Sequence, residues 1–183
     1  MANEDGFWPW ALKAYAGEGV AEACLALQDD HDQCVPLLLW VAWASWRGVA
    51  IGDVLADEAA GLARDWSQAV VAPLRNLRRR LKSPVSGNDE EVRLPLREKI
   101  KTVELEAERA LMAQLEALVV PADNGISQSE QMVASTIDDA LAGVARAWDE
   151  KSNAPDLKAA LIRLTQTLTK GGFLGYNGGT GQF

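Results

Sequence analysis

The chain has 183 residues, 48% of them apolar, which is enough for one domain with a buried core. Its formal net charge of −8 disfavours nucleic acid as a partner, because a phosphate backbone repels an acidic surface. The acidic N-terminus is unlike a signal peptide, and the apolar run 34–46 is shorter than the about 20 residues that cross a bilayer. We therefore expect a cytoplasmic protein with no membrane partner.

Helix-forming residues dominate the sequence, and the alternation of β-branched residues that marks strands is absent. We predict an all-α fold, a compact helical bundle, whose first helices cover about residues 7–16, 20–30 and 35–46. Pro9 is tolerated in the first turn of its helix, where the N–H that it lacks would have no partner.

The helix at 35–46 is apolar all round, so we expect its neighbours to enclose it at the centre of the domain. Five of the seven tryptophans lie within the first 46 residues, which places the centre of packing there. Whether these tryptophans fill the core or line a pocket stays open at this point.

A long helix is predicted at 53–81, with Pro73 expected to kink it or to divide it near Val71. Its expected inward stripe is Leu55, Ala59, Leu62, Trp66, Ala69 and Val70. A loop is expected at 83–95, followed by a helix at 96–118. The expected apolar stripe of that helix is Leu96, Ile100, Val103, Ala107, Leu111, Leu115 and Leu118, with Arg97, Lys101, Glu104 and Glu108 on its other faces.

Beyond Pro121 we expect a helical extension over 121–169 and a flexible tail over 170–183, which contains six glycines. Ser127 and Glu130 have the spacing of a capping box, so a helix is predicted at about 129–149 and another at about 156–169. The remaining part, 1–120, is then the principal helical domain.

Several motifs of the chain resemble a family of proteobacterial proteins of unknown function, DUF2390. The matching motifs are Phe7-Trp8-x-Trp10-Ala11-Leu12, Gly19-Val20-x-x-Ala23-Cys24-Leu25, Val35-x-Leu37-Leu38-Leu39-Trp40, Pro73-Leu74-Arg75-x-x-Arg78 and Glu104-Leu105-x-x-Glu108. The resemblance covers about residues 7–120. It implies a helical domain and carries no activity over to this chain.

A cluster of basic residues is the first candidate site. Arg75, Arg78, Arg79 and Lys82 are three or four residues apart, so they share one helix face and could clamp a carboxylate or a phosphate. The alternative is that acidic residues neutralise them within the fold. The candidates for that role are Glu90, Glu91 and Glu98, or Asp53, Asp57 and Glu58.

The acidic run 29–32 is interpreted as the solvated end of a helix, because no second acidic motif accompanies it. Cys24 and Cys34 match no zinc spacing, and we interpret them as buried thiols. His31, the only histidine, lies in an expected loop and forms no recognisable catalytic set with Cys34. We therefore expect no metal and no cofactor.

Two functions follow as hypotheses. The first is a non-enzymatic protein-interaction module, which binds another protein through an apolar groove or through the face from Arg75 to Lys82. The second is a small-molecule-binding protein or an enzyme with a Trp-lined pocket and the polar groups Gln28, Asp29 and Arg75. If Arg75, Arg78 or Arg79 points inward beside Asp29 or Glu104 around an open cavity, the second is favoured. A filled interior with the arginines facing solvent would favour the first. An anion-binding regulator of nucleic-acid machinery is a third possibility, which the net charge opposes.

Overall fold

The computed structural model describes residues 6–84, 90–119, 136–149 and 155–174, and the described residues are almost entirely helical. The all-α prediction is confirmed. The chain begins with α1 (Phe7–Tyr15), α2 (Val20–His31) and α3 (Val35–Trp46), within one residue of the predicted bounds. Gly19 before α2 and Asp32 after it both adopt positive φ, at 78° and 51°, so the backbone turns sharply at each end of α2.

The centre of the core is α3, as predicted. Every side chain from Leu37 to Ala44 is at most 3% exposed, because α1, α2, α4, α6 and α7 all pack against α3. Trp40 and Trp43 are fully buried, and Phe7 packs on Trp43 with ring centroids 5.3 Å apart. The central tryptophans therefore fill the core.

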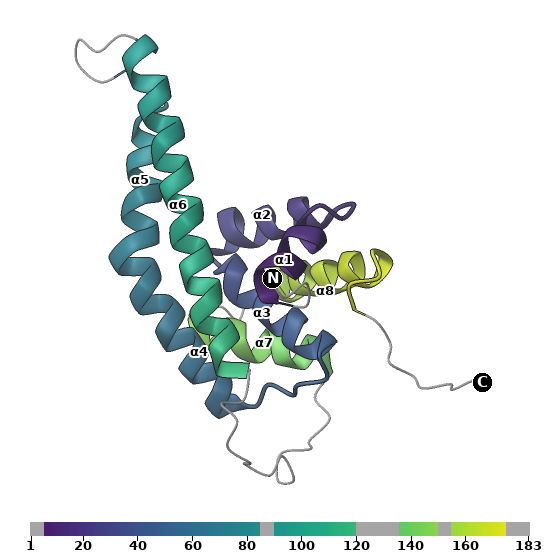
Figure 1. The fold of residues 1–183 in the computed structure, drawn as a ribbon. Helices are drawn as coiled ribbons and strands as arrows, with labels where there is room; N and C mark the ends of the chain where they lie inside the picture. The colour runs from purple at the N-terminus through teal and green to yellow at the C-terminus, as the bar shows by residue number, and fades with distance from the viewer. Residues whose placement is uncertain (1–5, 85–89, 120–135, 150–154, 175–183) are drawn as a thin grey trace.

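The predicted long helix is divided near Pro73. It consists of α4 (Asp53–Trp66), a π-helical turn η1 (Ser67–Val71) and α5 (Ala72–Arg80), which together form one long rod in Figure 1. Pro73 has no N–H to donate to the carbonyl of Ala69, and the wider π-helical turn contains that carbonyl.

The expected inward stripe of this helix was correct at Ala59, and its larger members pack only partly against the core. Leu55, Leu62 and Trp66 are only half-buried, and Ala69 is exposed. Small residues face the core instead, where they let α7 (Ile137–Trp148) approach α4 closely. These buried residues are Ala56, Ala59, Ala60 and Ala63.

Helix α6 (Glu90–Val119) begins six residues before the predicted start, so the predicted loop was wrong from Glu90 onward. Pro95 lies near the N-terminus of α6. The buried side chain of Arg93 donates to the carbonyl of Leu81 and ties the start of α6 to the end of α5. Figure 1 shows the resulting hairpin of α5 and α6, whose far end extends past the other helices.

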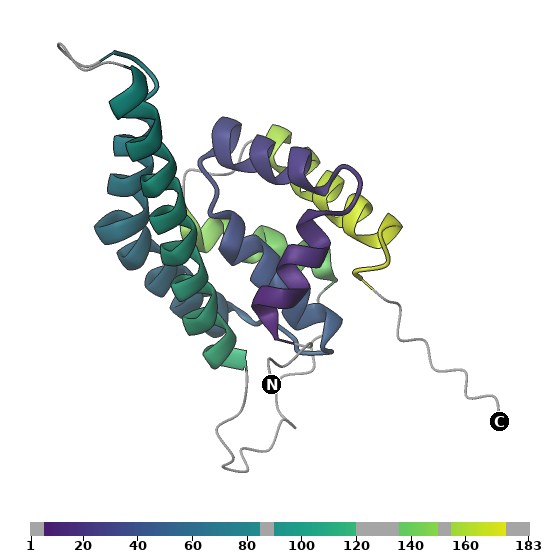
Figure 2. The same cartoon turned by 45° about the horizontal axis from the view of Figure 1, so that its top comes forward.

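The segment after residue 121 contributes to the same core. From α7, Leu141 and Val144 are fully buried; from α8 (Pro155–Lys170), Leu164 and Leu168 are fully buried as well. Figure 2 shows α8 running beside α2. Arg64 of α4 donates to carbonyls at the end of α7, where a cation also suits the helix dipole.

The predicted helices of this segment are present, and α7 begins later than expected. A capping box formed by Thr136 and Asp139 starts it, whereas the predicted box at Ser127 lies outside the described residues. Phe173 folds back and meets Trp10 edge-on at 6.3 Å. Residues 175–183 of the expected tail also lie outside the described part. Within the residues that the structure describes, no helix is long and apolar enough to span a membrane.

Candidate binding groove

A groove of about 580 Å³ lies between α1 and α2 on one side and the hairpin of α5 and α6 on the other. The start of α3 lines it as well. This volume falls within the range of about 300–1,000 Å³ that is typical of small-ligand sites. We call this feature the groove. The larger apolar side chains that line it are Trp8, Leu12, Leu25, Leu39, Leu105 and Met112.

Three of these apolar side chains are unusually open to solvent. Leu12 is 53% exposed, Leu25 47% and Leu105 50%. They come from three helices, α1, α2 and α6, and all three line the groove. Apolar side chains that converge around an open concavity from separate helices provide a surface for an apolar ligand.

The wall that α5 and α6 form carries four charged groups that belong to one hydrogen-bonded network. Arg75 Nε donates to Glu104 Oε1 at 3.0 Å, and Arg75 Nη2 donates to Glu108 Oε1 at 2.9 Å. Arg78 donates to both oxygens of Glu104, through Nη2 at 3.2 Å and through Nε. Two arginines of α5 therefore share one carboxylate of α6, and Arg75 alone reaches the second.

The two carboxylates differ in their environment. Burial acts to raise the pKa of Glu104, but the hydrogen bonds and charges of Arg78 and Arg75 outweigh it and leave that pKa below its ordinary value. Burial raises the pKa of Glu108, and the charge of Glu104 adds to this, while the single contact with Arg75 pulls the other way. Glu104 is thus held as a carboxylate, whereas Glu108 takes up a proton more readily.

The other predicted site residues lie around the groove. Gln28 lines it and donates to Asp29, which pairs with Arg79 at 3.3 Å and so links α2 to α5. Lys82 is exposed at the end of α5. The basic residues are therefore largely neutralised within the fold, but by Glu104, Glu108 and Asp29 and not by the acidic residues expected from the sequence.

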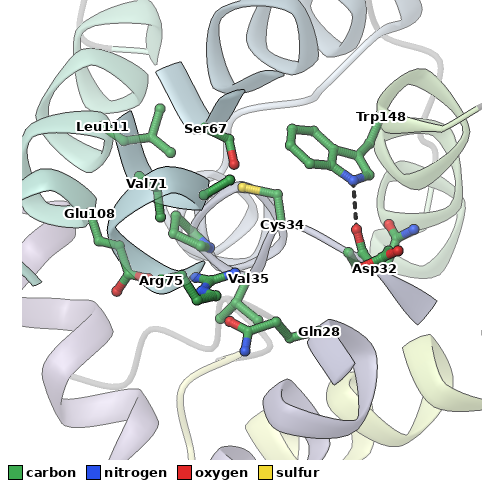
Figure 3. A pocket seen from close by; sticks show the side chains of 13 residues that line it. Gln28, Asp32, Cys34, Val35, Ser67, Val71, Arg75, Glu108, Leu111 and Trp148 are labelled. Atoms are coloured by element: carbon green, nitrogen blue, oxygen red, sulfur yellow. Dashed lines mark hydrogen bonds and ion pairs between the residues drawn. The ribbon is translucent and has the colours of Figure 1, made fainter. Parts of the chain in front are cut away.

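A smaller cavity of about 150 Å³, the inner pocket, adjoins the groove and shares Gln28, Arg75 and Glu108 with it. Figure 3 shows Arg75 and Glu108 on one side of the inner pocket and Trp148 on the other, with Ser67 and Cys34 between them. The π-helical turn η1 supplies Ser67 and Val71. Such turns frequently occur at functional sites, because they widen the helix locally.

The expectation of a Trp-lined pocket needs correction. Of the tryptophans, Trp8 lines the groove and Trp148 lines the inner pocket, where its Nε1 donates to the carbonyl of Asp32 at 2.8 Å. Arg109 lies over the Trp8 ring at 5.5 Å. Leucine is the most frequent residue in the groove walls, and the buried tryptophans pack within the core itself.

Sequence reasoning named Glu104 only as a possible neighbour of inward-pointing arginines, did not include Glu108 in the candidate site, and favoured a solvent-facing side of the helix for both. Glu104 is instead 5% exposed. A signal was available in the spacing: two carboxylates four residues apart on one helix match two arginines three residues apart on the preceding one. No group of three or more potential metal ligands occurs among the described residues.

The fold and the groove define a helical-bundle protein with an amphipathic concavity along one helical hairpin. Residues 6–115 match the model of a family described as protein of unknown function, DUF2390, and the chain belongs to this family. The resemblance drawn from the sequence is thus confirmed. No curated protein and no solved structure matches the chain. All residues that line the groove lie within the matched segment.

Proposed function

We propose that this protein binds a small amphipathic molecule in the groove. The observation that carries the proposal is the position of Arg75 and Arg78, which point inward beside Glu104 at the wall of an open cavity. The sequence hypotheses assigned this arrangement to ligand binding. A ligand of this kind would place its apolar part against the exposed leucines and its polar part against the charged wall.

Two residues of α6 allow a matched test. Leu105 is 50% exposed and lines the groove, whereas Val103 is 47% exposed and does not line it. We expect Leu105→Glu to weaken the binding of an apolar dye such as Nile red by about tenfold or more, because a charge would lie in the apolar wall. Val103→Glu should leave dye binding within about twofold of the wild type.

Fluorescence titration of both variants measures this, and circular dichroism checks that each retains its helices. Failure of the wild-type chain to bind any apolar probe would contradict the proposal. Equal weakening by both substitutions would contradict the location in the groove.

A protein-interaction module is the second candidate function, and a separate observation favours it. Val92, Leu96 and Val103 lie on one face of α6 at spacings of four and seven, and they are 64%, 47% and 47% exposed. The same pair of variants separates the two candidates: loss of a stoichiometric protein partner in Val103→Glu, with dye binding retained, would support the module. Docking of a protein through the expected basic face has less support, because Arg75 and Arg78 already form ion pairs with Glu104.

A further inference from the structure

We infer that the ligand of the groove is a monocarboxylate with an apolar body, and that Arg75 binds the carboxylate where the groove meets the inner pocket. This inference rests on the proposed function and names the ligand class of the same site. It is carried by the charges of the groove wall, by the position of Arg75 and by the length of the groove along α6.

The charges that line the groove favour a single negative charge on the ligand. Three cations, Arg75, Arg78 and Lys101, and two carboxylates, Glu104 and Glu108, line the groove. Lys101 also pairs at 3.8 Å with Glu98, which does not line it. The Glu104 side chain is only 7% exposed and accepts hydrogen bonds from both arginines. It is therefore a fixed part of the wall that the ligand does not displace. When both carboxylates are ionised, one positive charge remains, which a monoanion neutralises and a dianion exceeds.

Arg75 is the cation placed to receive the ligand. It lines both the groove and the inner pocket, and its side chain is 20% exposed. A guanidinium has five N–H donors in a planar fork, and the two contacts with Glu104 and Glu108 involve only Nε and Nη2. Further donors are thus available for a carboxylate, which a guanidinium binds through two parallel hydrogen bonds.

Glu108 competes with the ligand for Arg75. A ligand carboxylate that binds the remaining donors of Arg75 comes close to Glu108, and the two negative charges repel each other. The groups that face Glu108 are Arg75 and Arg78 from α5, Glu104 on its own helix, Tyr15 from α1 and Cys34 from α3, with Lys101 further along the groove. Of these groups, Arg75 donates a hydrogen bond to Glu108 at 2.9 Å, so Glu108 and the ligand share its donors.

The apolar part of the ligand has a defined length to fill. Lys101 and Met112, which both line the groove, are eleven residues apart on α6, so the groove extends about 16 Å along this helix, past Glu104 and Glu108. Leu105 lies between them, and Leu12 and Leu25 line the groove from α1 and α2. A medium-length alkyl chain suits such a wall better than a small polar acid does.

The experiment is isothermal titration of the full chain with four probes of one alkyl length: dodecanoate, dodecanol, dodecylamine and dodecyl phosphate. We expect dodecanoate to bind about tenfold or more tightly than dodecanol, the range expected for hydrogen bonds to a charged group. Dodecylamine and dodecyl phosphate should bind less tightly than dodecanoate. Equal affinity for all four, or a preference for the amine or the phosphate, would overturn the inference and leave the proposed function intact. Absence of binding by every probe would overturn both.

Two substitutions test the assignment of Arg75. Arg75→Gln should remove the preference for dodecanoate over dodecanol, whereas the control Arg80→Gln, at an exposed position on the same helix, should retain it. Glu108→Gln removes the competing charge and should raise that preference severalfold. This gain cannot result from loss of folding. An unchanged preference in both Arg75→Gln and Glu108→Gln would contradict the assignment.

Discussion

Arg75 and Glu108 form an ion pair at 2.9 Å, and both side chains line the groove as well as the inner pocket. The pair joins the middle of the helical hairpin at the point where the two cavities meet. Glu104, four residues earlier, is held by two arginines. The pKa values of two carboxylates on one helix are therefore shifted in opposite directions, and this difference can be measured.

Replacing each glutamate by glutamine should change stability in different directions. Glu104→Gln should lower the free energy of unfolding at neutral pH by about 2 kcal/mol or more, because Arg75 and Arg78 lose the charge that they share. Glu108→Gln should leave the free energy of unfolding unchanged or raise it, because burial makes the charged form of this side chain less favourable in the folded than in the unfolded state. Urea unfolding of both variants measures this, and equal destabilisation would contradict the assigned environments.

The same two groups predict how stability depends on pH. Glu104 has a lowered folded pKa, so its contribution is present above its ordinary pKa of 4.5 and is lost as the pH falls through the folded value. Glu108 has a raised folded pKa, so between 4.5 and that value the folded state retains a proton that the unfolded state has released. Its contribution is therefore lost as the pH rises through this window.

Unfolding curves at closely spaced pH values test these signs. Relative to the wild type, Glu108→Gln should flatten the decline of stability above pH 4.5, and Glu104→Gln should flatten the decline below it. Each difference has a limit of about 1.4 kcal/mol per pH unit, because one proton is involved. Parallel curves for the wild type and Glu108→Gln would show that the pKa of Glu108 is not raised.

Local patterns in the sequence predicted the parts of the fold that local physics determines. The apolar helix α3 and the break at Pro73 depend on composition and on a missing N–H, both of which the sequence displays. The environment of Glu104 depends on Arg78, 26 residues earlier in the chain. No periodicity within α6 contains that information, so Glu104 was predicted on a solvent-facing side.

The stripe predicted for α6 illustrates the same limit. Ile100, Ala107 and Leu111 are buried as expected, but Leu96 and Val103 are 47% exposed. All of them fit one helical period. The hairpin covers only the part of the stripe that faces α5 and the core, and the far end of the hairpin has no further helix beside it in Figure 1. Periodicity predicts a face, while burial depends on which neighbour is present.

The two cysteines should be unreactive in the folded protein. Burial raises the pKa of Cys24 and of Cys34 to about 12, and the thiolate is the reactive form. We expect Ellman's reagent at pH 8 to label neither thiol in the native chain and both in denaturant. Val54→Cys, at a position that is 75% exposed, should label at once as a positive control. Rapid labelling of native Cys34 would show that the inner pocket admits the reagent.

Two glycines provide a contrast in helix stability and packing. A Cβ at Gly61, within α4, would meet no atom within 4 Å, so Gly61→Ala should raise the free energy of unfolding by about 0.5–1 kcal/mol through the higher helix propensity of alanine. A Cβ at Gly17 would lie 2.8 Å from the ring of Phe173 and 3.0 Å from the carbonyl oxygen of Ala14. Gly17→Ala should therefore be destabilising.

Thermal unfolding measures the contrast. A gain of 1 kcal/mol corresponds to about 2–4 °C in Tm for a chain of this size, so Gly61→Ala should raise Tm by about 2 °C and Gly17→Ala should lower it. Phe173 follows α8 and also contacts Trp10, so part of the loss in Gly17→Ala is expected from disturbed packing of the residues after α8 on α1, and part from the Ala14 carbonyl. An unchanged Tm in Gly17→Ala would instead mean that the Phe173 ring moves aside with no loss of free energy of unfolding, and that its packing contributes little to stability.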